Sequence, residues 1–196
     1  YYKHHCRKYI FAGGPKENYE NSLRVLSYNE SLDRLGLSRE ENPVWYGDYD
    51  FSTGVKYFEQ FIKSFKGRMI EFPDVFVCAN DNIAAGFCYK AQQRGYQIPR
   101  DFKITGFDNL DKALYFEPQI TTVGHMRENI GNKTMEILAD VWAGKDVPGN
   151  HFMPSKCIFS ESCGCPNSGL LDYRKYARNQ VIAGVDKLDK EELLIK

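Results

Sequence analysis

Short apolar runs alternate along the chain with longer stretches in which apolar residues recur every three or four positions. The runs predict buried strands at residues 9–12, 44–46, 74–79 and 102–107. The stretches between them, near 18–35, 52–67 and 80–95, have the spacing of amphipathic helices. Strands joined by helices of this length form right-handed crossovers, so the pattern predicts a parallel sheet.

The alternation changes after residue 107. Residues 108–119 are polar enough to predict a loop, and 120–123 then predicts an extended segment. A helix is expected near 127–143, followed by a second extended segment at 152–159. The charged stretch 166–196 predicts a last helix, with too few heptads for a coiled coil.

Composition and charge narrow the class of protein. The 196 residues include 26 Lys and Arg against 26 Asp and Glu, and 42% of the chain is apolar. These values are typical of a globular domain rather than a disordered chain. A balanced charge disfavours a nucleic-acid surface, and no apolar run has the roughly 18 residues of a membrane span. We therefore expect contact with neither nucleic acid nor membrane.

The six cysteines are scattered rather than arranged as a disulfide framework. This usage predicts a reducing, cytoplasmic environment. A zinc site built from His4, His5 and Cys6, or from Cys163 and Cys165, would lack the C-x-x-C spacing, and we expect no metal. The first residue is not Met, and we expect the chain to be part of a longer protein.

Polar residues directly after the strands are candidates for ligand binding, because ligands of open parallel sheets lie beyond the carboxyl ends of the strands. A cation on the first helix could face the same edge. The hydrogen-bond donors and acceptors and the aromatic ring of these candidate residues suit a polyhydroxylated or amide-bearing small molecule. The candidates of this kind are Arg24, Asp48, Tyr49, Asn80, Asp108 and Asn109.

Each candidate has an alternative interpretation that involves no ligand. Either Asn80 or Asp81 can be the N-cap of the following helix. Asp108 can be a turn residue, Arg24 a solvated residue on a polar helix face, and Tyr49 a surface aromatic residue. Both interpretations stay open at this stage.

The sequence gives little support for a catalytic function. The sequence has no G-x-S-x-G elbow, Walker loop or H-E-x-x-H motif, and the residues after the first strand lack the spacing of a dinucleotide loop. His125 with Asp108 is the one pair near strand ends that could serve a small α/β enzyme. No cofactor is expected.

Residues 8–165 resemble the effector-binding core of LacI-type regulators, which share the periplasmic-binding-protein-like fold. The order and spacing of several short motifs carry the resemblance. The matching stretches are Phe11-Ala12-Gly13-Gly14-Pro15, Gly47-Asp48-Tyr49, Ala79-Asn80-Asp81, Ile98-Pro99-Arg100-Asp101, Thr105-Gly106-Phe107-Asp108-Asn109 and Pro118-Gln119-Ile120-Thr121-Thr122-Val123.

The resemblance implies a fold and a domain organisation. The fold is α/β, a three-layer parallel sheet of the periplasmic-binding-protein-like I type, as one lobe plus a C-terminal helix. Residues 1–165 would be the C-terminal lobe, of which about 126–147 would pack on a first lobe that the chain lacks. Residues 166–196 would link this lobe to an output domain, either a diguanylate cyclase or a DNA-binding domain of the AraC type.

The resemblance also implies the residues that contact the effector. They are Arg24, Tyr49, Asn80, Asp108 and His125, while Asp81 of the same motif is assigned to helix capping. The helix near 127–143 would leave its apolar side chains exposed without the first lobe. We therefore expect it to pack against a second copy in a homodimer, or to fold back onto its own sheet.

The function that follows is a non-enzymatic sensor of a sugar-like or nucleoside-like small molecule, in a bacterial LacI-type transcriptional regulator or signalling protein. Two alternatives remain at this stage. One is an extracytoplasmic solute-binding protein, and the other is a small α/β enzyme using His125 and Asp108.

Overall fold

The computed structural model describes residues 1–66, 72–125 and 127–165. Its centre is a four-stranded parallel sheet in the order β2-β1-β3-β4. The predicted α/β class and parallel sheet are thereby confirmed. The strands are β1 (Tyr9–Ala12), β2 (Val44–Trp45), β3 (Val75–Cys78) and β4 (Lys103–Thr105).

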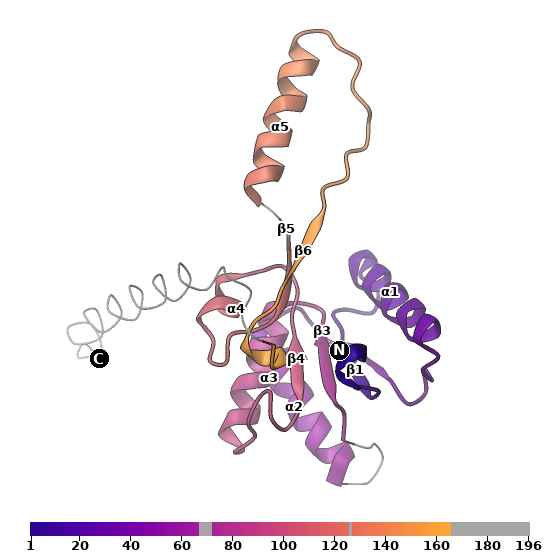
Figure 1. Cartoon of the computed structure of the whole chain (residues 1–196), viewed down its shortest axis with the longest axis vertical. Coiled ribbons are helices and arrows are strands. Elements are labelled where there is room, and N and C mark those ends of the chain that lie inside the picture. The colour runs from indigo at the N-terminus through magenta and orange to yellow at the C-terminus, as the bar shows by residue number, and fades with distance from the viewer. Residues whose placement is uncertain (67–71, 126, 166–196) are drawn as a thin grey trace, which may run out of the picture.

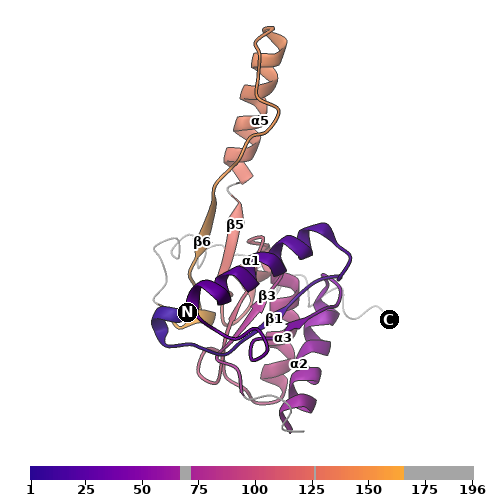
Figure 2. The same ribbon diagram turned by 90° about the vertical axis from the view of Figure 1, so that its right-hand side faces the viewer.

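Helices cover both faces of the sheet, which gives three layers. Helix α1 (Tyr19–Leu35) lies on one face, and α2 (Phe51–Lys66) and α3 (Asp81–Gln93) lie on the other (Figures 1 and 2). On the α1 face, the rings of Phe11 and Tyr28 pack with their centroids 5.1 Å apart. Strands β1 and β3 are almost entirely apolar, as expected for strands that are covered on both faces.

An aromatic cluster fills the layer between the sheet and the α2–α3 pair. Phe76 of β3 and Phe87 of α3 are 4.2 Å apart at their centroids, and both are fully buried. The other fully buried aromatic residues around them are Phe58, Phe61 and Phe102. Burial of this many rings, each contributing 150–250 Å² of apolar area, is the main stabilising contact of the lobe.

Two strands leave the lobe as an antiparallel pair. Strand β5 (Thr122–His125) pairs with β6 (Ser155–Ile158), and Thr121 also forms a parallel bridge to Thr105. Both predicted extended segments are thus present, shifted by a few residues. The pair forms a stalk that rises from the carboxyl edge of the parallel sheet (Figures 1 and 2).

Helix α5 (Arg127–Trp142) lies at the end of this stalk, away from the sheet (Figure 1). The expectation that it folds back onto its own sheet is wrong. A two-stranded stalk carries it outward, so several of its large apolar side chains face solvent, among them Met135 (60% exposed) and Trp142 (77% exposed). Packing against a second copy remains a prediction.

The segment expected to be a polar loop contains a short helix, α4 (Asp111–Tyr115). The buried side chain of Ala113 holds it against the lobe, a tertiary contact that local polarity does not reveal. Short 3-10 helices lie at both ends of the described chain, η1 (Tyr2–His4) and η2 (Glu161–Cys163). The predicted helix at 166–196 lies outside the described residues.

Among the helices of the described ranges, none combines the length and the apolar character needed to cross a bilayer.

Candidate functional site

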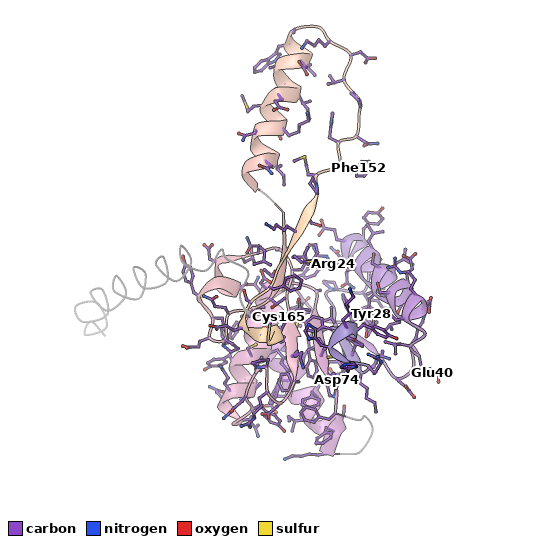
Figure 3. The ribbon with its side chains drawn as sticks, viewed as in Figure 1. Arg24, Tyr28, Glu40, Asp74, Phe152 and Cys165 are labelled. Carbon is purple, nitrogen blue, oxygen red and sulfur yellow. The ribbon has the colours of Figure 1, made fainter. Side chains whose placement is uncertain are left out.

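Arg24 occupies the centre of the candidate site, where α1 passes over the carboxyl ends of β3 and β4 (Figure 3). Its Nη1 donates a hydrogen bond to the carbonyl oxygen of Ala79, directly after β3. Its Nη2 lies 3.6 Å from Oδ1 of Asp108 and 3.6 Å from Oε2 of Glu20, one helical turn earlier. Arg24 therefore connects α1 to the ends of two strands.

Two aromatic rings flank the same guanidinium. The Cζ atom of Arg24 lies 4.4 Å from the ring centroid of Phe107 and 5.7 Å from that of Tyr49. Cations at these distances are attracted by the ring faces. The Arg24 side chain is only 20% exposed, so it is held at the sheet edge rather than extended into solvent. The interpretation as a solvated helix residue is wrong.

Tyr49 is half-buried and held at both of its ends. Its hydroxyl donates to Oδ1 of Asn18 over 3.2 Å, and its backbone carbonyl accepts from Nδ2 of Asn80 over 2.9 Å. Its ring also lies so close to Gly14 that a Cβ at that position would overlap it. Burial raises the pKa of the Tyr49 hydroxyl, and the opposing charge of Arg24 reduces that shift. Tyr49 is therefore part of the site wall and not a loose surface ring.

Asn80 is the N-cap of α3. Its Oδ1 accepts from the backbone N–H of Ile83 over 2.9 Å, while its Nδ2 donates to Tyr49. The capping interpretation of Asn80 is thus confirmed. Capping uses one acceptor position and the Tyr49 carbonyl takes one donor of the amide, so contact with a ligand through the others stays a prediction.

Asp81 does not cap the helix, and the assignment of that role to it is wrong. Its carboxylate is fully buried and accepts two hydrogen bonds of 2.7 Å, from the hydroxyl of Thr122 and from the N–H of Leu110. Burial raises the pKa of Asp81 to about 6, although these hydrogen bonds oppose the shift. Asp81 fastens the loop after β4 and the base of β5 to α3.

Asp108 follows β4 in a turn with left-handed backbone. Its φ is +93°, and that of the next residue, Asn109, is +52°. The N–H of Asp108 donates to the carbonyl of Val123 in β5 over 2.9 Å. Asp and Asn tolerate this region better than other residues with a Cβ, so the turn interpretation is correct for the backbone. The side chain itself lies 3.6 Å from Nη2 of Arg24, and its contact with a ligand stays a prediction.

For His125 the structure describes the position of the backbone but not that of the side chain. It is the last residue of β5 and pairs with Ser155 of β6. Its side chain lies outside the part of the chain that is described, so its contact with a ligand remains a prediction.

The structure brings Arg24, Tyr49, Asn80 and Asp108 together at one edge of the sheet, and we call this set the polar rim. It presents a cation, a carboxylate, an amide and an aromatic ring within one network of contacts. Sequence reasoning missed Asp81 as the residue that fastens this network and Phe107 as the ring under Arg24. The sequence signal for Asp81 is its position next to Asn80. Because the start of α3 needs only one N-cap residue, the second polar residue there must have another role.

A cavity of about 640 Å³ adjoins the polar rim on the α1 face of the sheet. Arg24 lines it, but Tyr49, Asn80 and Asp108 do not. Its walls are mostly apolar and include Phe11, Tyr28 and Phe107. Within the polar rim, Arg24 therefore reaches into this cavity, and the other three polar residues lie beside it.

The described part of the chain holds no group of three or more His, Cys, Asp or Glu side chains arranged to bind a metal ion.

Comparison with known proteins shows which protein family this chain matches. The family model described as periplasmic binding protein-like domain matches residues 1–163. The chain is 32% identical over 123 residues to the HTH-type transcriptional repressor PurR of Vibrio atlanticus, a match covering 63% of this chain and 35% of that protein. It is 29% identical over 150 residues to the HTH-type transcriptional repressor CytR of Escherichia coli K12, covering 76% and 42%.

Solved structures show the same fold. A LacI family transcriptional regulator from Silicibacter pomeroyi superposes with a TM-score of 0.70 at 19% identity, over 82% of this chain and 57% of that one. The matches cover less than half of the length of the two curated relatives.

Proposed function

The chain belongs to the periplasmic binding protein-like domain family, and from this premise we propose that it forms one lobe of the effector-binding core of a bacterial LacI-type regulator. The observation that carries the proposal is the position of Arg24. It joins Asp108 and Tyr49 at the carboxyl edge of the sheet, where ligands of this architecture bind. The curated relatives, both transcriptional repressors, support the same assignment.

The chemistry of the polar rim favours a neutral, polyhydroxylated ligand, such as a sugar or a nucleoside. Arg24 and Asp108 have opposite charges that already compensate each other at 3.6 Å, so a ligand need not bring a charge of its own. The guanidinium keeps unused donors and the carboxylate unused acceptors, which together match vicinal hydroxyl groups. The Tyr49 ring supplies an apolar face for a ring of the ligand.

The proposed mechanism is a shift in population between two lobe arrangements. The polar rim forms one side of a cleft, and an opposing lobe supplied from outside this chain forms the other. A ligand that contacts both sides binds the closed arrangement better and increases its population. The β5–β6 stalk and residues 126–147 would belong to the crossing between the lobes, with the apolar face of α5 packed on the opposing lobe.

Several properties follow for the whole protein. We assign it no catalytic role and a location in the cytoplasm, which its free cysteines and repressor relatives support. It would act as a homodimer, with nucleic-acid contacts made outside this chain. Residues 166–196, which lie outside the described structure, would connect the lobe to an output domain.

The test uses the full-length protein and a panel of monosaccharides, disaccharides and nucleosides, screened by thermal shift. The best ligand is then measured by calorimetry against two variants, Arg24→Gln and Asp108→Asn. Asparagine is chosen because it tolerates the left-handed backbone of position 108. Loss of one charged hydrogen bond, worth about 1.5–3 kcal/mol, should weaken binding about 10- to 100-fold in each variant.

Two matched controls stay outside the polar rim. Arg34→Gln removes an arginine from the last turn of the same helix, and Asp111→Asn removes an exposed carboxylate from α4. Both should leave the affinity unchanged. Unchanged affinity in Arg24→Gln and Asp108→Asn would instead show that the polar rim is not the binding site.

A further inference from the structure

Two thiols and an imidazole meet where the first residues of the chain lie beside the last described ones. Cys165 lies just after η2 (Figure 3), and its Sγ is 3.7 Å from Nε2 of His4 in η1. The neighbouring Cys163 is the last residue of η2. The turn after η2 lies beside β4, where the Ser162 hydroxyl donates to the carbonyl of Ile104, and it takes no part in the polar rim.

The two cysteines lie close together. The backbone N–H of Cys165 donates to Sγ of Cys163 over 3.3 Å. Gly164 between them has φ +74° and ψ +9°, a left-handed turn that brings its neighbours toward each other. Alpha carbons two residues apart are roughly 5–7 Å apart, which overlaps the range found across disulfides.

The two sulfur atoms differ in access. Cys163 is buried at 3% exposure, whereas Cys165 is partly exposed and has the His4 imidazole as a neighbouring proton acceptor. Cys78 and Cys88 are buried in the core, and burial raises the pKa of both. The pair at the end of the lobe therefore combines what thiol–disulfide exchange requires, namely one reachable thiol and a second thiol held close to it by the Cys165 N–H.

We propose that Cys163 and Cys165 form a reversible disulfide, which makes the turn after η2 a redox-responsive dithiol. The oxidant is a small disulfide of the glutathione class. Nothing in the described geometry requires a metal at this position, and the reaction proceeds by ordinary exchange.

The exchange takes place in two steps. His4 takes the Cys165 proton, and the thiolate attacks one sulfur of the small disulfide, breaking its S–S bond and releasing the first small thiolate. Cys163 then attacks the Cys165 sulfur of the mixed disulfide and expels the second small thiolate. The protons lost by the two cysteines end on the two small thiols. The protein loses two electrons and the small disulfide gains them.

The surroundings of Cys163 suit the resolving step. Burial raises the pKa of its thiol, but hydrogen bonds with Thr121 and Cys165 oppose burial, so the net pKa of Cys163 is lowered while that of Cys165 is raised. A lowered pKa increases the fraction of thiolate available to attack the mixed disulfide.

Oxidation has a structural consequence for the stalk. Cys163 donates its thiol hydrogen to the carbonyl of Ser160 over 3.1 Å, and a disulfide removes that donor. The adjacent Ser162 hydroxyl joins the N–H of Thr121, at the base of β5, to the carbonyl of Ile104 in β4, each over 2.8 Å. We expect the oxidised turn to loosen this junction and to speed hydrogen exchange at Thr121.

The test equilibrates the folded chain in glutathione buffers of graded redox ratio, alkylates the remaining thiols and identifies linked peptides by mass spectrometry. The expected product joins Cys163 to Cys165 and lacks two alkylated thiols. Cys165→Ser and Cys163→Ser should each abolish it. The matched control Cys157→Ser removes an exposed thiol on β6 and should leave the linkage intact.

Three results would overturn the proposal. A linkage to Cys6 or Cys157 would show that different thiols react. A stable glutathione adduct on Cys165 with no resolution would show that Cys163 does not take part. Zinc retained by the purified chain and released by Cys165→Ser would show that the cluster binds metal.

A second measurement separates the folded geometry from mere closeness in sequence. The same titration in concentrated urea reports the pair in the unfolded chain. The contacts described above predict that the midpoint redox ratio differs at least tenfold between the folded and unfolded chains. Equal midpoints would mean that the fold does not control the pair.

Discussion

Adjacent side chains at the start of α3 connect the polar rim to the rest of the lobe in two different ways. Asn80 caps the helix and holds the Tyr49 carbonyl. Asp81 turns the other way and binds Leu110 and Thr122, which lie 29 and 41 residues further along the chain. Asn80 therefore positions Tyr49 in the polar rim, and Asp81 positions the base of the β5–β6 stalk.

A pH dependence of stability follows from the raised pKa of Asp81. The pKa is about 6 in the folded chain against an ordinary value of 3.8. The folded state then binds this proton more tightly, so the stabilisation is complete below about pH 4 and is lost as the pH rises through about 6. Relative to Asp81→Asn, the wild-type free energy of unfolding should fall by about 3 kcal/mol between those limits.

Urea unfolding at several pH values measures this difference. Asp146→Asn, which alters an exposed carboxylate beyond α5, is the matched control and should show no comparable change in slope. A constant difference between wild type and Asp81→Asn across the pH range would contradict the prediction.

At the scale of elements, α2 and α3 touch backbone to backbone. A Cβ on Gly54 of α2 would overlap the carbonyl oxygen of Ile83, and a Cβ on Gly86 of α3 would overlap that of Phe51. Only glycine allows two helices to approach this closely. The crossing sets the position of the α3 N-terminus, and through it the positions of Asn80 and Asp81.

Alanine at Gly54 or Gly86 should therefore destabilise the lobe. Helix propensity alone favours alanine by up to about 1 kcal/mol, but the overlap with rigid backbone forces the helices apart and should cost about 1–3 kcal/mol or more overall. The midpoint of chemical denaturation measures the effect.

Gly131→Ala provides the matched control in α5, where nothing lies within 4 Å of the added Cβ. The same chemical change should be neutral or stabilising there, by up to about 1 kcal/mol. Equal effects at Gly54 and Gly131 would show that the close helix crossing does not control stability.

At the scale of the whole molecule, α5 extends from the lobe with an unpartnered apolar surface. Val141 is 51% exposed and Trp142 is 77% exposed, while Phe152 on the returning segment is 95% exposed (Figure 3). Large apolar side chains left in water favour association. In the full-length protein we expect the opposing lobe to cover this surface, and in this chain alone a second copy.

Sedimentation of this chain should show a dimer that dissociates on dilution. Replacing Val141 and Trp142 by serine removes two apolar contacts worth about 1.5–3 kcal/mol each, so the dissociation constant should rise more than tenfold. Glu136→Ser changes an exposed polar position of the same helix and should leave association unchanged. A dimer that persists in the double variant would place the interface elsewhere.

Local patterns were enough to predict much of this protein. Apolar runs and helical spacing depend on neighbours in sequence, so they placed the parallel sheet and its three covering helices. The motifs around Asn80 and Asp108 placed both residues at strand ends, and the fold brought them together with Arg24 as expected. The short helix α4 and the shifted limits of β5 escaped prediction because contacts with distant residues decide them.

Only the tertiary structure decided which neighbouring residue does what. Asn80 and Asp81 look equivalent as caps, and the partners that distinguish them come from Tyr49, Leu110 and Thr122, far away in the sequence. The same reason applies to α5. Its amphipathic pattern predicts that one face is buried, but the surface that covers this face cannot be read from the pattern. Sequence thus determined where polar and apolar side chains stand along each element, and long-range packing determined which of them meet.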